Sequence, residues 1–307
     1  MTKVFIDGSA GTTGLRIYER LATRSDFEFL KLSEELRKND EARREMLNLA
    51  DIVFLCLPDA AAIDAVAMIE NKNTAVIDTS TAHRTADGWT YGFPELWGMR
   101  DKIKNSKRIA NPGCHASGVV ALLAPLRESG IISKDAAVSA FSLTGYSGGG
   151  KKMIAEYETE GRDVLLDAPR MYALGQGHKH LKEIVKICDL DAPPVFCPIV
   201  APFYSGMEVT IPLHKKDING KVDDIKNIYK NYYKRGLVHF AEEDGEDGFM
   251  SAGALSGRDD MKITVCGNED RILLVSRFDN LGKGASGSAI QNMNILLGVD
   301  ENEGLNV

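Results

Sequence analysis

The sequence lacks a CxxC pair, a long apolar run and an excess of basic residues. Its five cysteines are an odd number spread along 307 residues, which fits neither a disulfide framework nor a zinc site. No apolar run reaches the roughly 18 residues that a membrane span needs, and the sequence shows no signal-peptide pattern. The formal net charge of -7 disfavours a nucleic-acid reader. We therefore expect a cytoplasmic protein that binds a small molecule, with no nucleic-acid, membrane or metal partner.

The rest of the composition is ordinary for a globular protein, with 44% hydrophobic and 26% charged residues. A chain of 307 residues exceeds the size at which a single hydrophobic core usually stops growing. We therefore expect two domains.

The first third of the sequence alternates short β-type runs with helical segments. The runs are residues 4–6, 27–32, 52–57 and 75–77, and a helix is expected from about Thr13. Buried runs separated by helices are typical of a parallel, doubly wound sheet in an α/β protein. The charged segment 34–49 predicts an amphipathic helix with a solvated face.

A second region begins near residues 111–113. It opens with an apolar helix, 116–127, and continues with strands that have fewer helices between them. The expected strands are 137–143, 195–200, 207–213, 263–265 and 272–275. This order favours a mixed or antiparallel sheet. A final helix, 287–297, could pack in either domain by its pattern alone.

Three glycines follow the first strand directly. Gly8, Gly11 and Gly14 lie where the strand turns into a helix, which is the context of a dinucleotide-binding turn. Glycine lets the backbone approach a pyrophosphate, whose charge meets the N–H groups at the helix start. The spacing GxxGxxG is weak as a bare pattern, and its alternative is a tight turn with no ligand.

The end of the second strand bears on which nicotinamide cofactor is used. An acidic residue here, Glu34 or Glu35, would hold the ribose of NAD. Ser33, Arg37 and Lys38 offer instead a hydroxyl and cations suited to the 2′-phosphate of NADP. We favour NADP, and the alternative is that the two cations only decorate a helix surface.

Cys114 follows Asn-Pro-Gly and precedes the apolar helical run. The positive end of a helix favours thiolate over thiol, so this cysteine is a candidate nucleophile. Downstream, His178 and His180 offer the acid or base that thiolate chemistry needs. They lack a third metal ligand at a suitable spacing. Glu183 is either part of that chemistry or a helix-capping side chain.

Together these residues identify a resemblance that covers the whole chain. The sequence resembles the N-acetyl-γ-glutamyl-phosphate reductases in their shorter form. The motifs that carry the resemblance are GSAGTTG (8–14), STAHR (80–84), GFPEL (92–96), NPGCHASG (111–118), GHKHLKEI (177–184) and DNLGKGASGSAIQN (279–292). The glycine turn and NPGC alone would also suit the aspartate-semialdehyde dehydrogenases.

The resemblance implies a two-domain architecture. Residues 1–113 and 285–307 would form an NADP-binding Rossmann domain, to which the final helix returns. Residues 114–284 would form an α+β catalytic and oligomerisation domain with a mixed sheet of the glyceraldehyde-3-phosphate-dehydrogenase-like type. A homodimer or homotetramer is implied as well.

The resemblance also implies roles for individual residues. Cys114 would be the nucleophile, with His178 and His180 equally eligible as the acid–base residue. By resemblance Arg84 is the leading candidate for binding the substrate phosphate, and Glu183 is a further substrate-binding candidate. Lys151 and Lys152 follow the glycine-rich segment 147–150 and are second candidates for the phosphate; the alternative is a flexible loop with solvated lysines. Asn280 and Gly284 are implied to touch the cofactor near its nicotinamide half. With the glycine turn and the segment after the second strand, the candidate cofactor-binding residues are Gly8, Ser9, Gly11, Thr12, Thr13, Gly14, Ser33, Arg37, Asn280 and Gly284. One departure is His115, which stands where long-form members tend to have another aromatic residue.

The implied reaction is the NADPH-dependent reduction of N-acetyl-γ-glutamyl phosphate to N-acetylglutamate 5-semialdehyde in arginine biosynthesis. It would pass through a thioester on Cys114, with release of phosphate. One rival is an aspartate-semialdehyde dehydrogenase or a related acyl-phosphate reductase. A rival of another class is a non-catalytic protein that senses a dinucleotide.

Overall fold

The computed structural model describes residues 1–307, which form two compact units. The first unit comprises Met1–Pro94, Gly98–Gly113 and Ala285–Leu305, and the second comprises Glu95–Trp97, Cys114–Gly284 and Asn306–Val307. The chain passes from the first unit to the second between Gly113 and Cys114. No helix in either unit is long and apolar enough to cross a membrane.

The first unit is built on a sheet in which every strand pair is parallel, in the order β2-β1-β3-β4-β6-β5. Its strands are β1 (Thr2–Asp7), β2 (Phe27–Leu30), β3 (Ile52–Leu55), β4 (Ala75–Asp78), β5 (Thr90–Tyr91) and β6 (Arg108–Ala110). The predicted parallel, doubly wound sheet is confirmed. Because strand order reverses between β1 and β3, a crevice is expected at their carboxyl ends.

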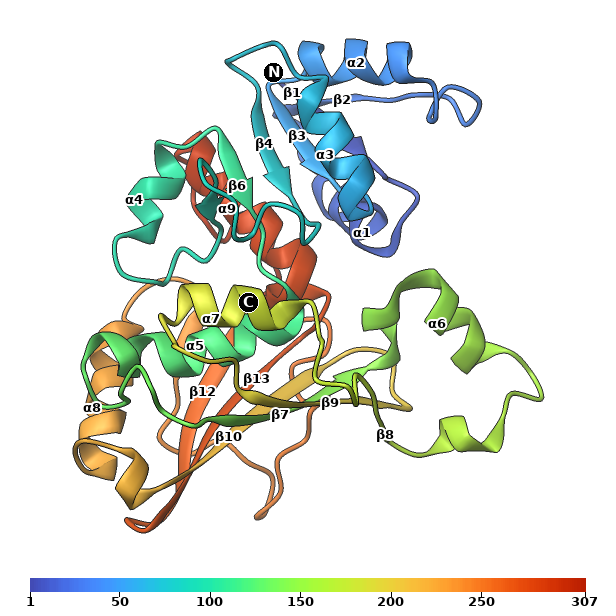
Figure 1. Ribbon diagram of the computed structural model, residues 1–307. Coiled ribbons are helices and arrows are strands. Elements are labelled where there is room, and N and C mark those ends of the chain that lie inside the picture. The colour runs from blue at the N-terminus through green and yellow to red at the C-terminus, as the bar shows by residue number, and fades with distance from the viewer. The chain divides into compact units, whose positions relative to one another are not determined.

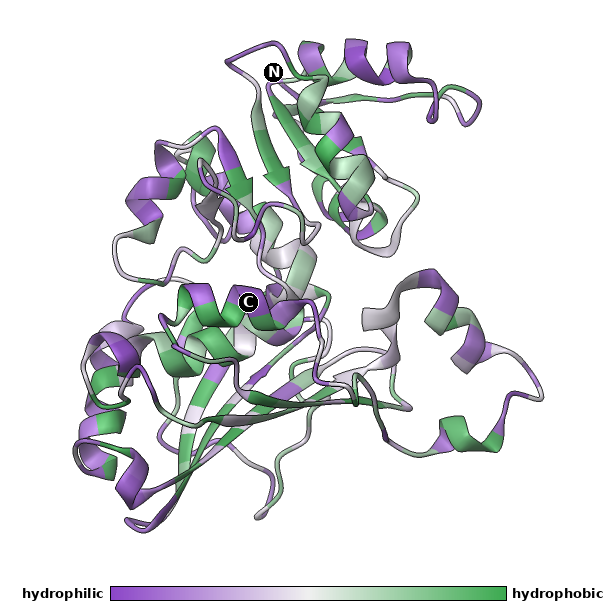
Figure 2. Cartoon of the chain, in the orientation of Figure 1, coloured by the Kyte–Doolittle hydropathy of each residue, from purple (hydrophilic) through white to green (hydrophobic).

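Helices cover both faces of this sheet. They are α1 (Thr12–Leu21), α2 (Asp40–Leu49), α3 (Asp59–Ala67), α4 (Met99–Lys104) and α9 (Gly287–Leu297). In β1, Val4 and Ile6 join a core with residues of α1 and α9, whereas Phe5 joins a separate core with residues of α2 and α3. The strands are accordingly hydrophobic along their length, as Figure 2 shows. The final helix therefore belongs to the first unit.

The predicted charged helix over 34–49 is wrong in its first turn. The helix begins at Asp40, because the Asn39 side chain accepts a hydrogen bond from the Ala42 backbone N–H at 2.9 Å and caps it. The segment before it forms a turn in which the Ser33 carbonyl accepts from the backbone of Arg37. Residues after β2 are therefore free to line the end of the sheet.

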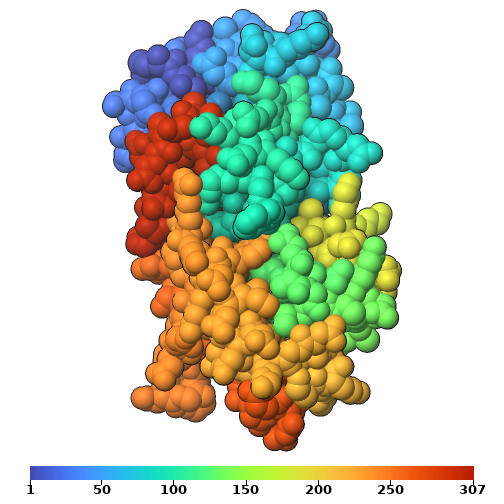
Figure 3. Space-filling model, turned by 90° about the vertical axis from the view of Figure 1, so that its left-hand side faces the viewer, coloured from blue at the N-terminus to red at the C-terminus, as the bar shows by residue number.

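The second unit is built on a mixed sheet of order β11-β12-β13-β10-β7-β9-β8, as predicted. Its strands are β7 (Ser139–Gly145), β8 (Arg170–Met171), β9 (Val195–Ala201), β10 (Met207–His214), β11 (Val238–Phe240), β12 (Met261–Gly267) and β13 (Arg271–Phe278). Pairs β7·β9 and β11·β12 are parallel, and the others are antiparallel. The turn between β12 and β13 protrudes as a tip of this unit in Figures 1 and 3.

Helices of the second unit lie on one face of its sheet (Figure 1). They are α5 (Cys114–Glu128), α7 (His180–Ile187) and α8 (Val222–Tyr232), while α6 (Gly150–Glu158) lies beyond the β8 side. The strands alternate accordingly. Along β10, Val209 and Ile211 are fully buried beneath the helices. The opposite face is not covered by helices and exposes Phe141, Val195 and Leu273.

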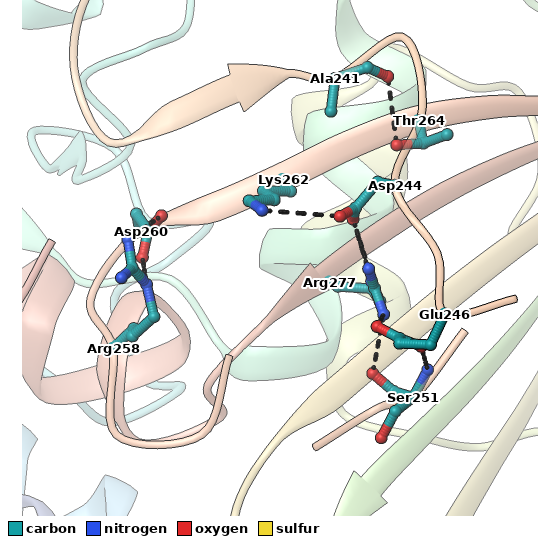
Figure 4. Close-up of polar contacts among 9 residues, drawn as sticks. All are labelled: Ala241, Asp244, Glu246, Ser251, Arg258, Asp260, Lys262, Thr264 and Arg277. Carbon is teal, nitrogen blue, oxygen red and sulfur yellow. Dashed lines mark hydrogen bonds and ion pairs between the residues drawn. The ribbon is translucent and has the colours of Figure 1, made fainter. Parts of the chain in front are cut away.

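Part of that opposite face is covered by residues 241–256, which we name the strap. Arg277 of β13 is buried under it, and its guanidinium lies 2.7 Å from Asp244 and 2.7 Å from Glu246 (Figure 4). It also donates to the Ser251 carbonyl at 3.2 Å. The start of the strap is tied to β12, because Thr264 donates to the carbonyl of Ala241. A buried guanidinium thus holds the strap against the face of the sheet opposite the helices.

Candidate functional site

A cavity of about 590 Å³ lies at the carboxyl ends of β1 and β3 in the first unit. Its wall contains residues of the glycine turn, of the segment after β2, and of the chain after β3: Asp7, Gly8, Ser9, Ala10, Gly11, Lys31, Leu32, Glu34, Arg37, Lys38, Cys56, Leu57 and Pro58. This is the switch point of the strand order, where open parallel sheets bind their ligands. The glycine turn and the cations after β2, which are separate in sequence, meet at this cavity.

At two positions of the glycine turn, Gly8 and Gly14, the surrounding backbone leaves no room for a side chain. Gly8 has a φ of +89°, and a Cβ there would lie 2.3 Å from the Cys56 carbonyl oxygen. A Cβ on Gly14 would lie 2.5 Å from the Gly8 carbonyl oxygen. The helix start has no side-chain cap, and the Thr12 hydroxyl is buried without a hydrogen-bond partner. The backbone cradle and the unsatisfied donors fit the pyrophosphate of a dinucleotide.

The remaining cofactor candidates of this unit lie around the same cavity. Ser9 is exposed and lines it, and Thr13 lies in the first turn of α1. Arg37 is half-exposed and pairs with Glu34 at 3.3 Å, and both line the cavity. Ser33 precedes them but does not line the cavity itself.

Cys114 is the first residue of α5, a helix of 15 residues, and its side chain is partly exposed. The positive end of so long a helix favours the thiolate. Gly284 packs directly against it, since a Cβ there would lie 2.9 Å from the Cys114 Cβ. The segment DNLGKGASGSAIQN, which contains Gly284, is thus in van der Waals contact with Cys114.

Three imidazoles gather in the second unit near the start of α5. The rings of His178 and His180 have centroids 4.7 Å apart, and His115 lies 5.5 Å and 5.7 Å from them. Phe196 closes the cluster 5.1 Å from His178. The sequence predicted the pair on GHKH, but it left His115 as an unexplained departure. No group of three or more His, Cys, Asp or Glu side chains is arranged to hold a metal ion.

The surroundings keep two of these rings neutral. Burial, with the nearby charge of His178, lowers the pKa of His115 to about 3. Burial and the charge of Lys179 lower the pKa of His178 to about 4. The Nδ1 atom of His178 accepts the His180 backbone N–H at 3.2 Å, so its neutral form carries the hydrogen on Nε2. His178 is thus a neutral hydrogen-bond donor at pH 7.

Tyr172 and Ser142 are two residues that the sequence analysis missed. The Tyr172 hydroxyl lies 2.7 Å from Nε2 of His115, and Ser142 Oγ lies 2.6 Å from Nδ1 of the same ring. Burial and the negative charge of Cys114 raise the pKa of Tyr172 above its usual value of 10. No motif marked either residue, because β7 and the segment after β8 carry no recognisable spacing.

Arg84 is buried in the first unit, on the loop that follows β4. Its Nε donates to the Asn111 carbonyl at 2.9 Å and its Nη2 donates to the Thr79 carbonyl at 2.9 Å. The same loop is braced by buried Asp78, which lies 2.6 Å from Nδ1 of His83. The backbone thus fixes the guanidinium next to the NPGC segment.

The other substrate candidates lie in the second unit. Lys151 and Lys152 are exposed in the first turn of α6. Glu183 is buried in the first turn of α7, on the helix that His180 begins. The structure places His180 and Glu183 in the first turn of one short helix, with His178 just before it, whereas the two lysines are exposed to solvent.

Both the oxygen and the nitrogen of the Asn280 side-chain amide form hydrogen bonds within the second unit. Its oxygen accepts the Gly206 backbone N–H at 2.9 Å, and its nitrogen donates to Ser147 Oγ at 3.0 Å. Nearby, Lys283 and Glu95 form a fully buried ion pair at 2.8 Å. Both belong to motifs that the sequence analysis quoted, but their pairing had no sequence signal. The GKGASG segment is therefore fixed from several sides.

Family models match almost all of the chain. "Semialdehyde dehydrogenase, NAD binding domain" matches residues 3–106, and "Semialdehyde dehydrogenase, dimerisation domain" matches residues 114–280. The fold agrees with this class. A crystal structure of aspartate semialdehyde dehydrogenase II from Vibrio cholerae aligns with a TM-score of 0.74 over 97% of this chain and 98% of that one, at 17% sequence identity.

The curated relatives narrow the class. "N-acetyl-gamma-glutamyl-phosphate reductase 2" of Nostoc sp. is 41% identical over 320 residues, covering 99% of both chains. "N-acetyl-gamma-glutamyl-phosphate reductase" of Brucella melitensis biotype 2 is 43% identical over 306 residues, covering 96% of this chain and 99% of the relative. The chain belongs to the N-acetyl-γ-glutamyl-phosphate reductase family, and the resemblance drawn from its motifs is confirmed.

Proposed function

We propose that this protein reduces N-acetyl-γ-glutamyl phosphate to N-acetylglutamate 5-semialdehyde with NADPH, releasing phosphate, in arginine biosynthesis. The observation that carries the proposal is Cys114 at the start of α5, beside neutral imidazoles and Tyr172. Relatives with this name match the chain over nearly its whole length. A thiol and an imidazole in one cluster have no use in a protein that only senses a dinucleotide.

In the proposed reaction, Cys114 attacks the carbonyl carbon of the acyl phosphate. The C–O bond to phosphate breaks, phosphate leaves, and a thioester remains on the sulfur. Backbone N–H groups at the start of α5 stabilise the oxyanion of the tetrahedral intermediate. His178 supports the same charge through Nε2–H, because its Nδ1 is already an acceptor. His180 is then the remaining candidate for carrying the proton.

When bound, NADPH supplies the hydride that reduces the thioester to the aldehyde. The glycine turn with Ser9, Thr12 and Thr13 would hold its pyrophosphate. Arg37 and Lys38, which line the cavity, would bind the 2′-phosphate. Ser33, which precedes them in the chain, is proposed to donate a further hydrogen bond to it. Gly284 is proposed for the nicotinamide half, supported by its contact with Cys114. Asn280 is proposed to act there by holding the backbone of its loop.

Arg84 is our first candidate for gripping the phosphate of the substrate. Its guanidinium is buried and donates to the carbonyls of Asn111, in the segment that leads to Cys114, and of Thr79, so it needs little ordering to bind. Lys151 is the second candidate, because its exposed ammonium group could form an ion pair with the phosphate of the substrate. Buried Glu183 would act by orienting the histidine pair at the start of α7.

The first test is turnover in the reverse direction, with N-acetylglutamate 5-semialdehyde, phosphate and NADP. We expect phosphate-dependent formation of NADPH. Aspartate semialdehyde run beside it tests the second candidate function, which the Vibrio cholerae structure favours through its fold alone. A kcat/KM for aspartate semialdehyde above that for the acetylated aldehyde would overturn the proposal.

The face of the second sheet that no helix covers, outside the part under the strap, is the proposed surface for a homodimer. It exposes Phe141, Val195 and Leu273, and the matching family model bears the description of a dimerisation domain. Replacement of Phe141 with Glu should lower the mass measured by light scattering. Replacement of Leu165 with Glu is a matched control, because Leu165 is exposed elsewhere in the same unit. A cytoplasmic location is part of the proposal, since all five cysteines are free thiols.

A further inference from the structure

His115 lies between two hydroxyl groups in the second unit. Its Nδ1 is 2.6 Å from Ser142 Oγ, and its Nε2 is 2.7 Å from the Tyr172 hydroxyl. The ring is 3% exposed and Ser142 is fully buried. His115 also follows Cys114 directly in α5, so one of the three side chains belongs to the residue next to the cysteine.

The neutral state of His115 limits how these bonds can run. A neutral imidazole has one N–H donor and one acceptor nitrogen, so one hydroxyl must donate to it and the other must accept from it. The Ser142 hydroxyl has His115 as its one hydrogen-bond partner. If it accepted, its own hydrogen would be buried without an acceptor, at a cost of about 1–3 kcal/mol. Ser142 therefore donates to Nδ1.

This choice fixes the other end of the ring. With Nδ1 as the acceptor, the hydrogen is on Nε2, which donates to the Tyr172 oxygen. The hydrogen of Tyr172 is then not used by His115. Tyr172 also lies 5.9 Å from His178, ring centroid to ring centroid, and the negative charge of Cys114 is near enough to help raise the pKa of the phenol. The phenol stays protonated and can donate.

We propose that Ser142 and His115 are positioning residues that turn the Tyr172 hydroxyl so that it donates a hydrogen bond to the negative charge formed at Cys114. The charge is that of the oxyanion formed on the acyl group bound to Cys114 during turnover. Two of the three side chains, Ser142 and Tyr172, are absent from the motifs that suggest the reaction. The inference deepens the proposed function and rests on it for the turnover assays only.

The central test compares Tyr172→Phe, His115→Phe and the double variant in the reverse assay. Loss of one donor to a developing oxyanion lowers kcat on the order of 10²-fold, and we expect this for Tyr172→Phe with a nearly unchanged KM. His115→Phe should lower kcat less. The double variant should be no slower than Tyr172→Phe, because His115 acts through Tyr172. Multiplied losses in the double variant would overturn the positioning role.

A matched control separates catalysis from packing. Tyr229 is fully buried, and its hydroxyl donates to the Leu122 carbonyl of the same helix α5. Tyr229→Phe removes an equivalent buried hydroxyl and should keep kcat within about twofold of the parent. Tyr172 is only partly buried, so Tyr172→Phe should fold, and the test does not depend on the stability of His115→Phe. If Tyr172→Phe also keeps kcat within about twofold, the proposal fails.

A second readout does not depend on the substrate. The rate of iodoacetamide alkylation of Cys114, measured against pH, reports the thiol pKa. We expect Tyr172→Phe and Ser142→Ala to shift its midpoint to higher pH, with Tyr172→Phe giving the larger shift. Unshifted midpoints would show that the Tyr172 hydroxyl does not act on the charge of Cys114, and would overturn the proposal. Shifted midpoints in a protein that turns over neither aldehyde would keep this inference and sink the proposed function instead.

Discussion

The cofactor cavity and the cluster around Cys114 are built in opposite ways. In the first unit, the turn at the cavity is formed by backbone, with glycines that leave no space for a Cβ at Gly8 or Gly14. In the second unit, the site is a set of packed side chains in which His115 and His178 are held neutral. A backbone site tolerates no added atoms, whereas a side-chain site depends on protonation.

The largest expected effect is on the side-chain site. Cys114→Ser should lower turnover on the order of 10⁴-fold or more, because the thiolate is the bond-forming atom. The affinity for NADPH, measured by fluorescence, should stay near that of the parent, since the glycine turn is untouched. Cys266→Ser is the matched control and should turn over normally. Equal loss of NADPH affinity in Cys114→Ser would break the separation of the two sites.

A second prediction uses pH. The folded pKa values of His115 and His178, about 3 and about 4, are below the unfolded value of 6.5. Below pH 6.5 the unfolded chain therefore takes up protons that the folded chain does not, so stability is present above 6.5 and is lost toward pH 4 and below. Between pH 7 and 5 the buried His115 ring lowers the free energy of unfolding by about 2 kcal/mol, and the partly exposed His178 ring lowers it by less because solvent screens it.

Urea unfolding at pH 7, 6 and 5 measures this slope. His178→Phe should remove the smaller part of the histidine contribution to it. A variant with the parent's slope would mean that the ring titrates normally in the folded protein.

The third prediction concerns the backbone site. Gly8→Ala should lower the unfolding free energy by about 3 kcal/mol, since it combines a strained φ with a Cβ that has no room. Gly88→Ala is the control, because Gly88 has a similar φ of +79° and open space around it. It should lose only about 1 kcal/mol. Equal losses would show that the approach to the Cys56 carbonyl is not limiting.

The smallest effect is expected for Arg37, a side chain that lines the same cavity as the glycine turn. Arg37→Ala should raise the Kd for NADP on the order of tenfold and leave the Kd for NAD unchanged, because only NADP carries the 2′-phosphate. Arg44 is an exposed arginine on α2 that pairs with Glu70, and Arg44→Ala is the control. Titration calorimetry measures both. A parallel rise for NAD would remove Arg37 from the 2′-phosphate.

The fold could be predicted from the sequence because the two periodicities were clear. Runs such as 52–57 had no alternation and became strands buried on both faces. The helix over 34–49 was predicted too long, because charge density was taken for helical content and the Asn39 cap was not recognised. The position of the final helix came only from the family resemblance, because its contacts with the first sheet are nonlocal.

The candidate site was predicted in part. Glycine at a tight turn and cysteine at a helix start are local signals, so the turn and Cys114 could be read from single segments. Tyr172 and Ser142 could not, because they meet His115 only through the pairing of β7, β8 and β9. The pair of Lys283 and Glu95 likewise joins positions far apart in the chain.

The strap has a consequence for assembly. By lying over Arg277, it removes the β12 side of the outer sheet face from solvent and leaves the apolar part on β7, β9 and β13 bounded. In the proposed homodimer, a partner copy could contact only the part of this face that the strap leaves open, so the strap would mark one border of the contact surface.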